Sequence, residues 1–237
     1  MTRGQGRAML QGLRRGIGPH NAIFIPAGTL FSLDLGKTGF GLAVQIPLNH
    51  GLPLPEDAVL LRVRDVQAQA EITGRLDTLQ REISTARPFR HHAVTAHAIL
   101  LAVCLRRQLG LQPADQSEDK RPTAAHRLVA AFCALVSRDY RSGKPMADYA
   151  TMLGVTPTHL TRSCKDCCGM TAADLLTLRS LCAARDMIET TDLPLKDIGE
   201  ALGFGSAAYF SRFVQHHTGS SPSALRKKAV PSTVTSR

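Results

Sequence analysis

The sequence predicts an α+β multidomain protein in which a partial antiparallel β region and a helical pair precede an all-α domain of about seven helices. Three observations lead to this prediction. Short apolar runs separated by Gly/Pro turns occupy residues 20–65. Apolar residues then recur at helical spacing between residues 66 and 111. Beyond residue 124, two stretches repeat the same order of short helix, glycine turn and capped helix, which is typical of a helix-turn-helix motif.

The first 65 residues are expected to form the β-rich region. Short apolar or alternating runs follow one another at residues 22–25, 30–35, 40–46 and 59–63. Runs of this length between turn residues indicate an antiparallel sheet or a partial barrel. Residues 1–18, which precede them, are basic and contain no apolar run of the length that a signal peptide needs.

A helical pair is expected over residues 66–111. Its first apolar stripe is carried by Val66, Ile72, Leu76, Leu79 and Ile83, and that helix should end near Pro88. Its second stripe is carried by Val94, Ile99, Leu100, Val103, Cys104 and Leu105. Two such helices pack antiparallel and leave a surface for a second subunit, so a homodimer is expected. Residues 112–123 are polar and almost free of apolar groups, which indicates a linker, and residues 230–237 form a tail.

The composition favours an anionic partner and a reducing compartment. The chain carries 29 Lys and Arg against 19 Asp and Glu, for a formal charge of +10. Nucleic acid is therefore the first expectation, and an acidic membrane surface the second. No run of about 18 apolar residues occurs, so no membrane span is expected. The cysteines lie in stretches with helical patterns, which favours the cytoplasm over a secreted disulfide framework.

The two helix-turn-helix motifs are predicted from residues with defined conformational roles. In the first motif, over 146–162, Gly154 supplies the turn, and Thr156-Pro157 provides an N-cap followed by a proline at the first helical position. In the second motif Gly203 supplies the turn and Ser206 the cap. Between them, the capping pattern Thr171-x-x-Asp174 opens a long helix, one face of which is expected to carry Leu175, Leu178, Cys182 and Ile188. The core of this region is expected to contain Leu153, Leu160, Ile198, Leu202, Phe204, Phe210 and Phe213.

Residues 124–229 resemble the DNA-binding domain of the AraC/XylS family of transcription regulators. The residues that carry the resemblance are Leu178-Arg179, Ala183, Ile188, Asp197 to Phe204, Tyr209 to Arg212, Gly219, Ser221-Pro222 and Arg226, with looser agreement at Leu160 to Arg162, Lys165, Gly169 and Thr171. The chain departs from the family pattern at Gly199, Cys164, Val214 and Gln215-His216. These departures bear on the strength of DNA binding more than on the fold.

The resemblance also implies which residues contact DNA. The exposed starts of the two second helices would face base edges through Thr158, Thr161 and Arg162 in the first motif, and through Ala207, Ala208, Ser211 and Arg212 in the second. Arg162 and Arg212 would pair with guanine O6 and N7, or alternatively contact phosphate. Lys165 and His216 complete the expected DNA-binding set. Lys196 and the Arg226-Lys227-Lys228 cluster are further candidates for phosphate contact, although solvation is the favoured interpretation for Lys227 and Lys228.

No catalytic, cofactor or metal site is predicted. The cluster Cys164-x-x-Cys167-Cys168, together with Cys182, is assigned to packing, with redox sensing and metal binding as the alternatives. Residues 20–31 resemble part of the cupin-like sensor domain that is common in the AraC/XylS family. They lack the His-x-His pair of a metal-binding enzymatic cupin.

The expected function is therefore a cytoplasmic, sequence-specific transcription regulator that reads two adjacent major-groove segments of promoter DNA. RNA polymerase is the expected protein partner, and a small-molecule effector bound at residues 1–65 could modulate the activity. One rival interpretation is a cupin-type metalloenzyme with an appended helical domain, which metal analysis would identify. The other is a helical adaptor that does not bind DNA and would show no salt-dependent affinity for a duplex.

Overall fold

The computed structural model describes residues 1–47, 51–111 and 123–229. The chain divides into two compact units, residues 1–123 and 124–237. Residues 112–122 of the expected linker and the expected tail at 230–237 lie outside the described residues.

The N-terminal unit contains two small antiparallel sheets. Strands β1 (Gly6–Leu10), β2 (Leu13–Ile17) and β4 (Phe31–Asp34) form one sheet in the order β2-β1-β4. Strands β3 (Asn21–Phe24) and β5 (Val59–Arg62) form the other. The expected antiparallel β region is confirmed.

Two details of that β region differ from the sequence prediction. Strands β1 and β2 were not expected, because their arginines mask the apolar pattern. They form a hairpin through Gln11 and Gly12, whose φ angles of 49° and 79° suit a two-residue turn between Leu10 and Leu13. The strand expected at 40–46 is wrong: only Phe40 makes an isolated bridge, to Arg3, and the remainder has no partner strand.

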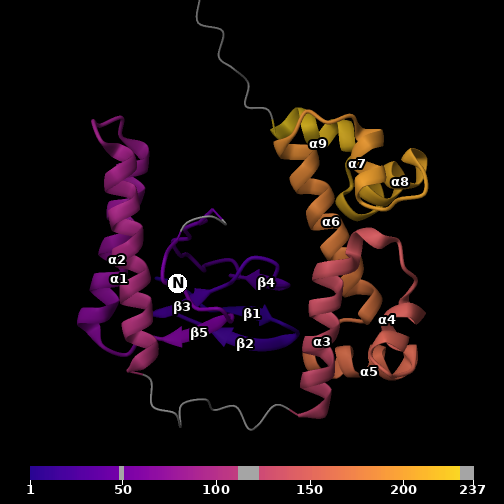
Figure 1. Cartoon of the computed structure of the whole chain (residues 1–237), viewed down its shortest axis with the longest axis horizontal. Coiled ribbons are helices and arrows are strands. Elements are labelled where there is room, and N and C mark those ends of the chain that lie inside the picture. The colour runs from indigo at the N-terminus through magenta and orange to yellow at the C-terminus, as the bar shows by residue number, and fades with distance from the viewer. Residues whose placement is uncertain (48–50, 112–122, 230–237) are drawn as a thin grey trace, which may run out of the picture. The chain divides into compact units, whose positions relative to one another are not determined.

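Helices α1 (Val66–Ser84) and α2 (Arg90–Gly110) form the expected helical pair and run antiparallel side by side (Figure 1). Helix α1 ends before the Pro88 that was expected to stop it. Leu79 and Cys104 are buried between the helices, and the Cys104 thiol donates a hydrogen bond to Glu71 Oε1 at 3.0 Å. The predicted stripes are wrong at both ends of the first helix, where Val66 and Ile83 are exposed, and in the middle of the second, where Ile99 and Leu100 are exposed.

The described part of the C-terminal unit is all-α, as predicted, with seven α-helices and one 3₁₀ turn. Their bounds are α3 (Ala124–Asp139), η2 (Tyr140–Ser142), α4 (Met146–Met152), α5 (Pro157–Cys168), α6 (Ala172–Thr190), α7 (Leu195–Ala201), α8 (Ala207–Thr218) and α9 (Pro222–Ala229). In the described parts of both units, no helix combines the length and apolar character needed to cross a bilayer.

The core of the C-terminal unit agrees with most of the predicted core positions. Fully or almost fully buried are Leu160, Ile198, Leu202 and Phe210, while Phe204 and Phe213 are partly buried against the same cluster and Leu153 is half-buried. The inner stripe predicted for α6 is confirmed at Leu175 and Ile188. It is wrong at Leu178 and Cys182, which are exposed because they lie on the solvent face of the helix.

Candidate nucleic-acid interface

The first helix-turn-helix motif consists of α4 and α5. Helix α4 ends in a tight turn in which the backbone N–H of Val155 donates to Ala150 O at 3.0 Å, and Gly154 takes a φ of 67°. The side chain of Thr156 then accepts from the N–H of His159 and caps α5, which starts with Pro157. Every local signal seen in the sequence thus serves its expected role.

The second motif, formed by α7 and α8, reproduces this geometry about 50 residues later. Phe204 N–H donates to Gly199 O at 2.9 Å, and Gly203 takes a φ of 79°. Ser206 caps α8 by accepting from the N–H of Tyr209. Helices α5 and α8 have the same length, and each ends at a left-handed glycine. The two motifs are therefore structural repeats.

The repeat explains why a glycine occupies position 199. In the first motif the equivalent residue, Ala150, is fully buried, and the α5 residue at the position equivalent to Phe210 is the buried Leu160. In the second motif the facing side chain is the larger Phe210, and a Cβ on Gly199 would lie 3.2 Å from it. The glycine makes room for the phenyl ring. A departure from the family pattern that costs helix propensity is therefore offset by closer packing.

The predicted DNA-contacting residues lie on one face of each second helix. On α5, Thr158, Thr161, Arg162 and Lys165 follow the spacing i, i+3, i+4, i+7, which places them on one side. On α8 the equivalent positions are Ala208, Ser211, Arg212 and Gln215, preceded by Ala207 and followed by His216. Thr161 and Ser211 are half-buried and the others are exposed.

The two faces carry different chemistry. Lys165 in the first helix is replaced by the uncharged Gln215 in the second, and Thr158 by Ala208. Arg162 and Arg212 occupy equivalent positions, and among the described residues neither forms an ion pair or side-chain hydrogen bond. Both guanidinium groups are therefore free to bind an external acceptor. The first helix offers more groups that can hydrogen-bond to bases.

Helix α6 separates the two motifs. It opens with a capping box in which Thr171 and Asp174 bond each other's backbone N–H groups. Its 19 residues span about 28 Å at the standard helical rise. The α4–α5 pair lies toward one end of α6 and the α7–α8 pair toward the other, on the same side of the helix (Figure 1).

The 3₁₀ turn η2 joins the two motifs at a second place. Tyr140 is 9% exposed and belongs to the core cluster that contains Ile188 and Ile198. A Cβ on Gly203, in the turn of the second motif, would overlap the carbonyl oxygen of Arg141. On the other side, Tyr149 of α4 donates a hydrogen bond from its hydroxyl to Asp139 O at 3.1 Å. Both motifs thus pack against one short segment.

Two of the predicted phosphate contacts have intramolecular partners. Arg226 donates to Ile188 O at 3.3 Å and to Leu193 O at 2.7 Å, which fastens α9 to the end of α6. Lys196 lies 3.7 Å from Glu200 in an exposed ion pair. Arg226 therefore has a structural role in the C-terminal unit, whereas Lys196 remains largely exposed.

The cysteines pack within the helical core. Burial raises the pKa of Cys133 and of Cys164 to about 12, so both thiols stay protonated at neutral pH. Cys168 donates to Cys164 O at 2.9 Å, just as its counterpart Thr218 donates to Val214 O at 2.8 Å. In the parts of the chain that the structure describes, no three His, Cys, Asp or Glu side chains gather as metal ligands.

Residues 149–228 match the family model described as a helix-turn-helix domain. The matched stretch begins in α4 and ends in α9. It confirms the C-terminal helix-turn-helix domain that the sequence predicts and agrees with the resemblance to AraC-type DNA-binding domains. No curated protein matches the chain.

Several solved structures are similar to part or all of the chain. A transcriptional regulator from Chromobacterium violaceum, of the AraC-type DNA-binding domain-containing proteins, is 22% identical, with 46% of this chain and 96% of that chain covered and a TM-score of 0.41. The C-terminal domain of AraT, a response regulator from Geobacillus stearothermophilus, is 25% identical, with 50% and 96% covered and a TM-score of 0.43. ToxT from Vibrio cholerae is 13% identical, with 97% and 88% covered and a TM-score of 0.40. All three TM-scores lie below 0.5.

Proposed function

We propose that this protein is a transcription regulator of the AraC type that binds specific promoter sequences through α5 and α8, because residues 149–228 match a helix-turn-helix domain. The observation that carries the proposal is the structural repeat. Two helices of equal length expose equivalent faces, and each presents an arginine that has no partner among the described residues. Helices held on one side of α6 suit two successive major-groove segments, which lie about 34 Å apart.

The two motifs should contribute unequally to sequence recognition. Thr158, Thr161 and Arg162 offer hydrogen-bonding groups to base edges, and Arg162 would bind guanine through O6 and N7. Ala207 and Ala208 offer only apolar contacts, for example to a thymine methyl group. Helix α8 would therefore act mostly as an anchor, with Ser211, Arg212 and His216 near the backbone. Lys165 would add a phosphate contact on the first helix.

Selection of bound sequences from a random duplex pool, with the full chain, tests this function. We expect a motif with two blocks whose centres lie about 10 base pairs apart, of which the block read by α5 is the more strongly defined. Binding to the selected duplex should weaken steeply as salt is raised, because phosphate contacts release counterions. A full chain that folds yet selects no motif, and binds no duplex at low salt, would contradict the proposal.

Finer parts of the function rest on the N-terminal unit. A homodimer is supported by the apolar side chains that α1 and α2 expose, among them Val66 and Ile83. A homodimer would bind two copies of the motif in the selected site.

A small-molecule effector is supported by an open hollow of about 360 Å³ lined by His20, Arg62, Arg64 and Gln69. An effector bound there would shift the binding curve of the selected duplex. Recruitment or obstruction of RNA polymerase in the cytoplasm would complete the regulation.

A further inference from the structure

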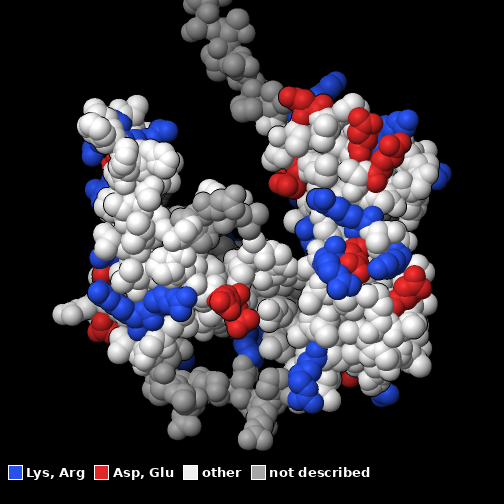
Figure 2. Space-filling model, viewed as in Figure 1, with Lys and Arg blue, Asp and Glu red and all other residues white. Residues whose placement is uncertain are grey.

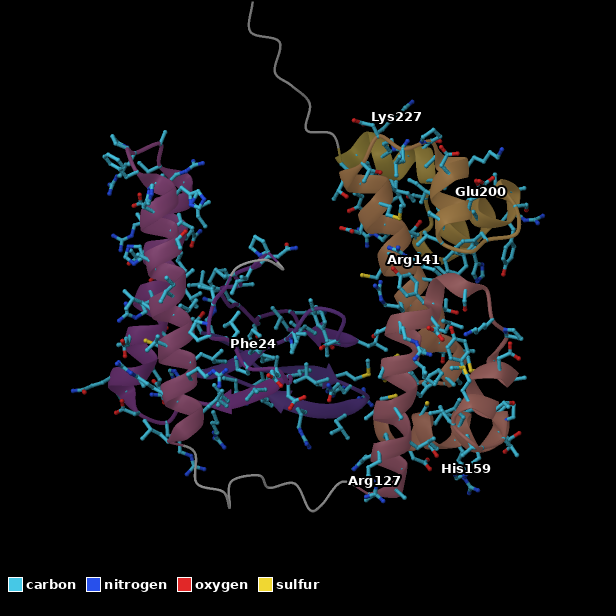
Figure 3. The ribbon with its side chains drawn as sticks, in the orientation of Figure 1. Phe24, Arg127, Arg141, His159, Glu200 and Lys227 are labelled. Carbon is cyan, nitrogen blue, oxygen red and sulfur yellow. The ribbon has the colours of Figure 1, made fainter. Side chains whose placement is uncertain are left out.

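A group of basic side chains lies where the chain passes from α3 to α4. Arg138, Arg141 and Lys144 lie within seven residues of sequence, and Arg179 of α6 reaches the same place. We call these four residues the junction cluster. Figure 3 places Arg141 between Glu200 of α7 and His159 of α5, and Figure 2 shows Lys and Arg side chains gathered over the middle of this unit.

Two residues hold the junction cluster in place. The hydroxyl of Tyr140 accepts a hydrogen bond from Arg141 Nε at 2.9 Å, and the guanidinium of Arg179 lies 3.9 Å from the centre of its ring. Asp139 accepts from Arg138 Nε at 2.6 Å and from Lys144 Nζ at 3.0 Å. These two cations keep the pKa of the Asp139 carboxyl well below its usual range, so it stays ionised.

The cluster keeps an excess of positive charge. One carboxylate, Asp139, is shared between Arg138 and Lys144, and the side chains of Arg141 and Arg179 contact the neutral Tyr140. The Arg138 side chain is 64% exposed, and Arg141 is exposed as well. Side chains fixed in this way lose little conformational freedom when they bind an anion, which distinguishes them from mobile solvated lysines.

The position of the cluster suggests which anion it meets. Segment η2 packs between the motifs, against Gly203 on one side and, through Asp139, against Tyr149 on the other. Figure 1 shows this segment on the side of α6 that carries both motifs. A duplex that spans α5 and α8 must pass this point, and between two successive major-groove segments it presents a minor groove lined on both sides by phosphates.

We propose that the junction cluster binds the phosphates that flank this central minor groove, as a third contact between the two reading helices. The inference rests on the proposed DNA-binding function and adds residues that neither motif contains. A phosphate contact of this kind positions the duplex without reading its sequence.

The test compares Arg141→Gln with the unchanged full chain on the selected duplex, by fluorescence anisotropy over a range of salt. The slope of log K against log salt should become shallower by about 1, and binding at about 0.1 M salt should weaken by about tenfold. The selected motif should stay the same. Arg141→Lys, which keeps the charge, should restore the slope.

Lys227→Gln on α9 is the matched control, because it removes one exposed charge from the same unit and should leave the slope unchanged. Arg138→Gln provides a second test, at a side chain that is 64% exposed. If the unchanged chain binds its duplex and both glutamine variants keep its slope, the inference is overturned, and an acidic protein surface becomes the better partner for the cluster. Failure of the unchanged chain to bind any duplex would instead contradict the proposed function.

Discussion

Arg162→Ala should weaken binding to the selected duplex by about 1–3 kcal/mol, which is the discrimination that one bidentate arginine–guanine pair provides. The reason is that Arg162 lies exposed on the reading face of α5, without an intramolecular partner among the described residues. The variant should also lose its preference at one base of the selected motif, while the other positions keep theirs. Binding curves on the selected duplex and on its single-base variants measure both effects.

Arg212→Ala is the matched control for this prediction, since Arg212 occupies the equivalent position in α8. Its neighbours Ala207 and Ala208 leave α8 with few groups that hydrogen-bond to bases. We therefore expect Arg212→Ala to weaken binding to all duplexes alike and to change no base preference. If Arg162→Ala selects the unchanged motif with unchanged affinity, its assignment to a base is wrong.

Gly203→Ala should destabilise the C-terminal unit strongly, on the order of 3 kcal/mol or more. Two effects add. The φ of 79° disfavours any side chain by about 1–2 kcal/mol, and the new Cβ would overlap the carbonyl oxygen of Arg141, a backbone atom that cannot move aside alone. Denaturant unfolding of the full chain, followed by its helical circular dichroism, measures the change.

Gly154→Ala provides the comparison that isolates the second effect. Gly154 is the counterpart of Gly203 and has a similar φ of 67°, but a Cβ there would meet open space. Its cost should therefore be limited to the backbone conformation, about 1–2 kcal/mol. Equal losses for the two variants would show that the packing of the second turn against η2 contributes nothing to stability.

The helix-turn-helix motifs could be predicted from the sequence because their signals are local. Gly154, Thr156 and Pro157 each fix a backbone angle or satisfy a free N–H within a few residues. The same holds for Gly203 and Ser206. The core positions of α5 and α8 follow from helical spacing once these ends are known, and Leu160 and Phe210 are indeed buried.

The features that could not be predicted from the sequence depend on contacts between distant residues. Strand β1 is stabilised by pairing with β4 as well as β2, whereas residues 41–46 resemble a strand in sequence but pair with no strand in the described part of the chain. The junction cluster was missed for a similar reason. Arg179 joins it across the ring of Tyr140, and its place between the motifs depends on Gly203, some 60 residues beyond Tyr140. A charged stretch at 138–144 is the one local signal that the sequence offers.

The central claim is that α6 and the junction at η2 hold two equivalent reading helices at a fixed separation. The most direct measurement compares binding of the full chain to the selected duplex with binding to the same duplex carrying insertions of about 5 or about 10 base pairs between its blocks. An insertion of about 5 base pairs rotates one block to the opposite side of the duplex, and one of about 10 moves it a full turn away. We predict that either insertion reduces binding to the level of a duplex whose second block has been randomised, because α6 cannot stretch and α8 then meets unselected sequence. Unchanged affinity for either insertion would contradict the claim.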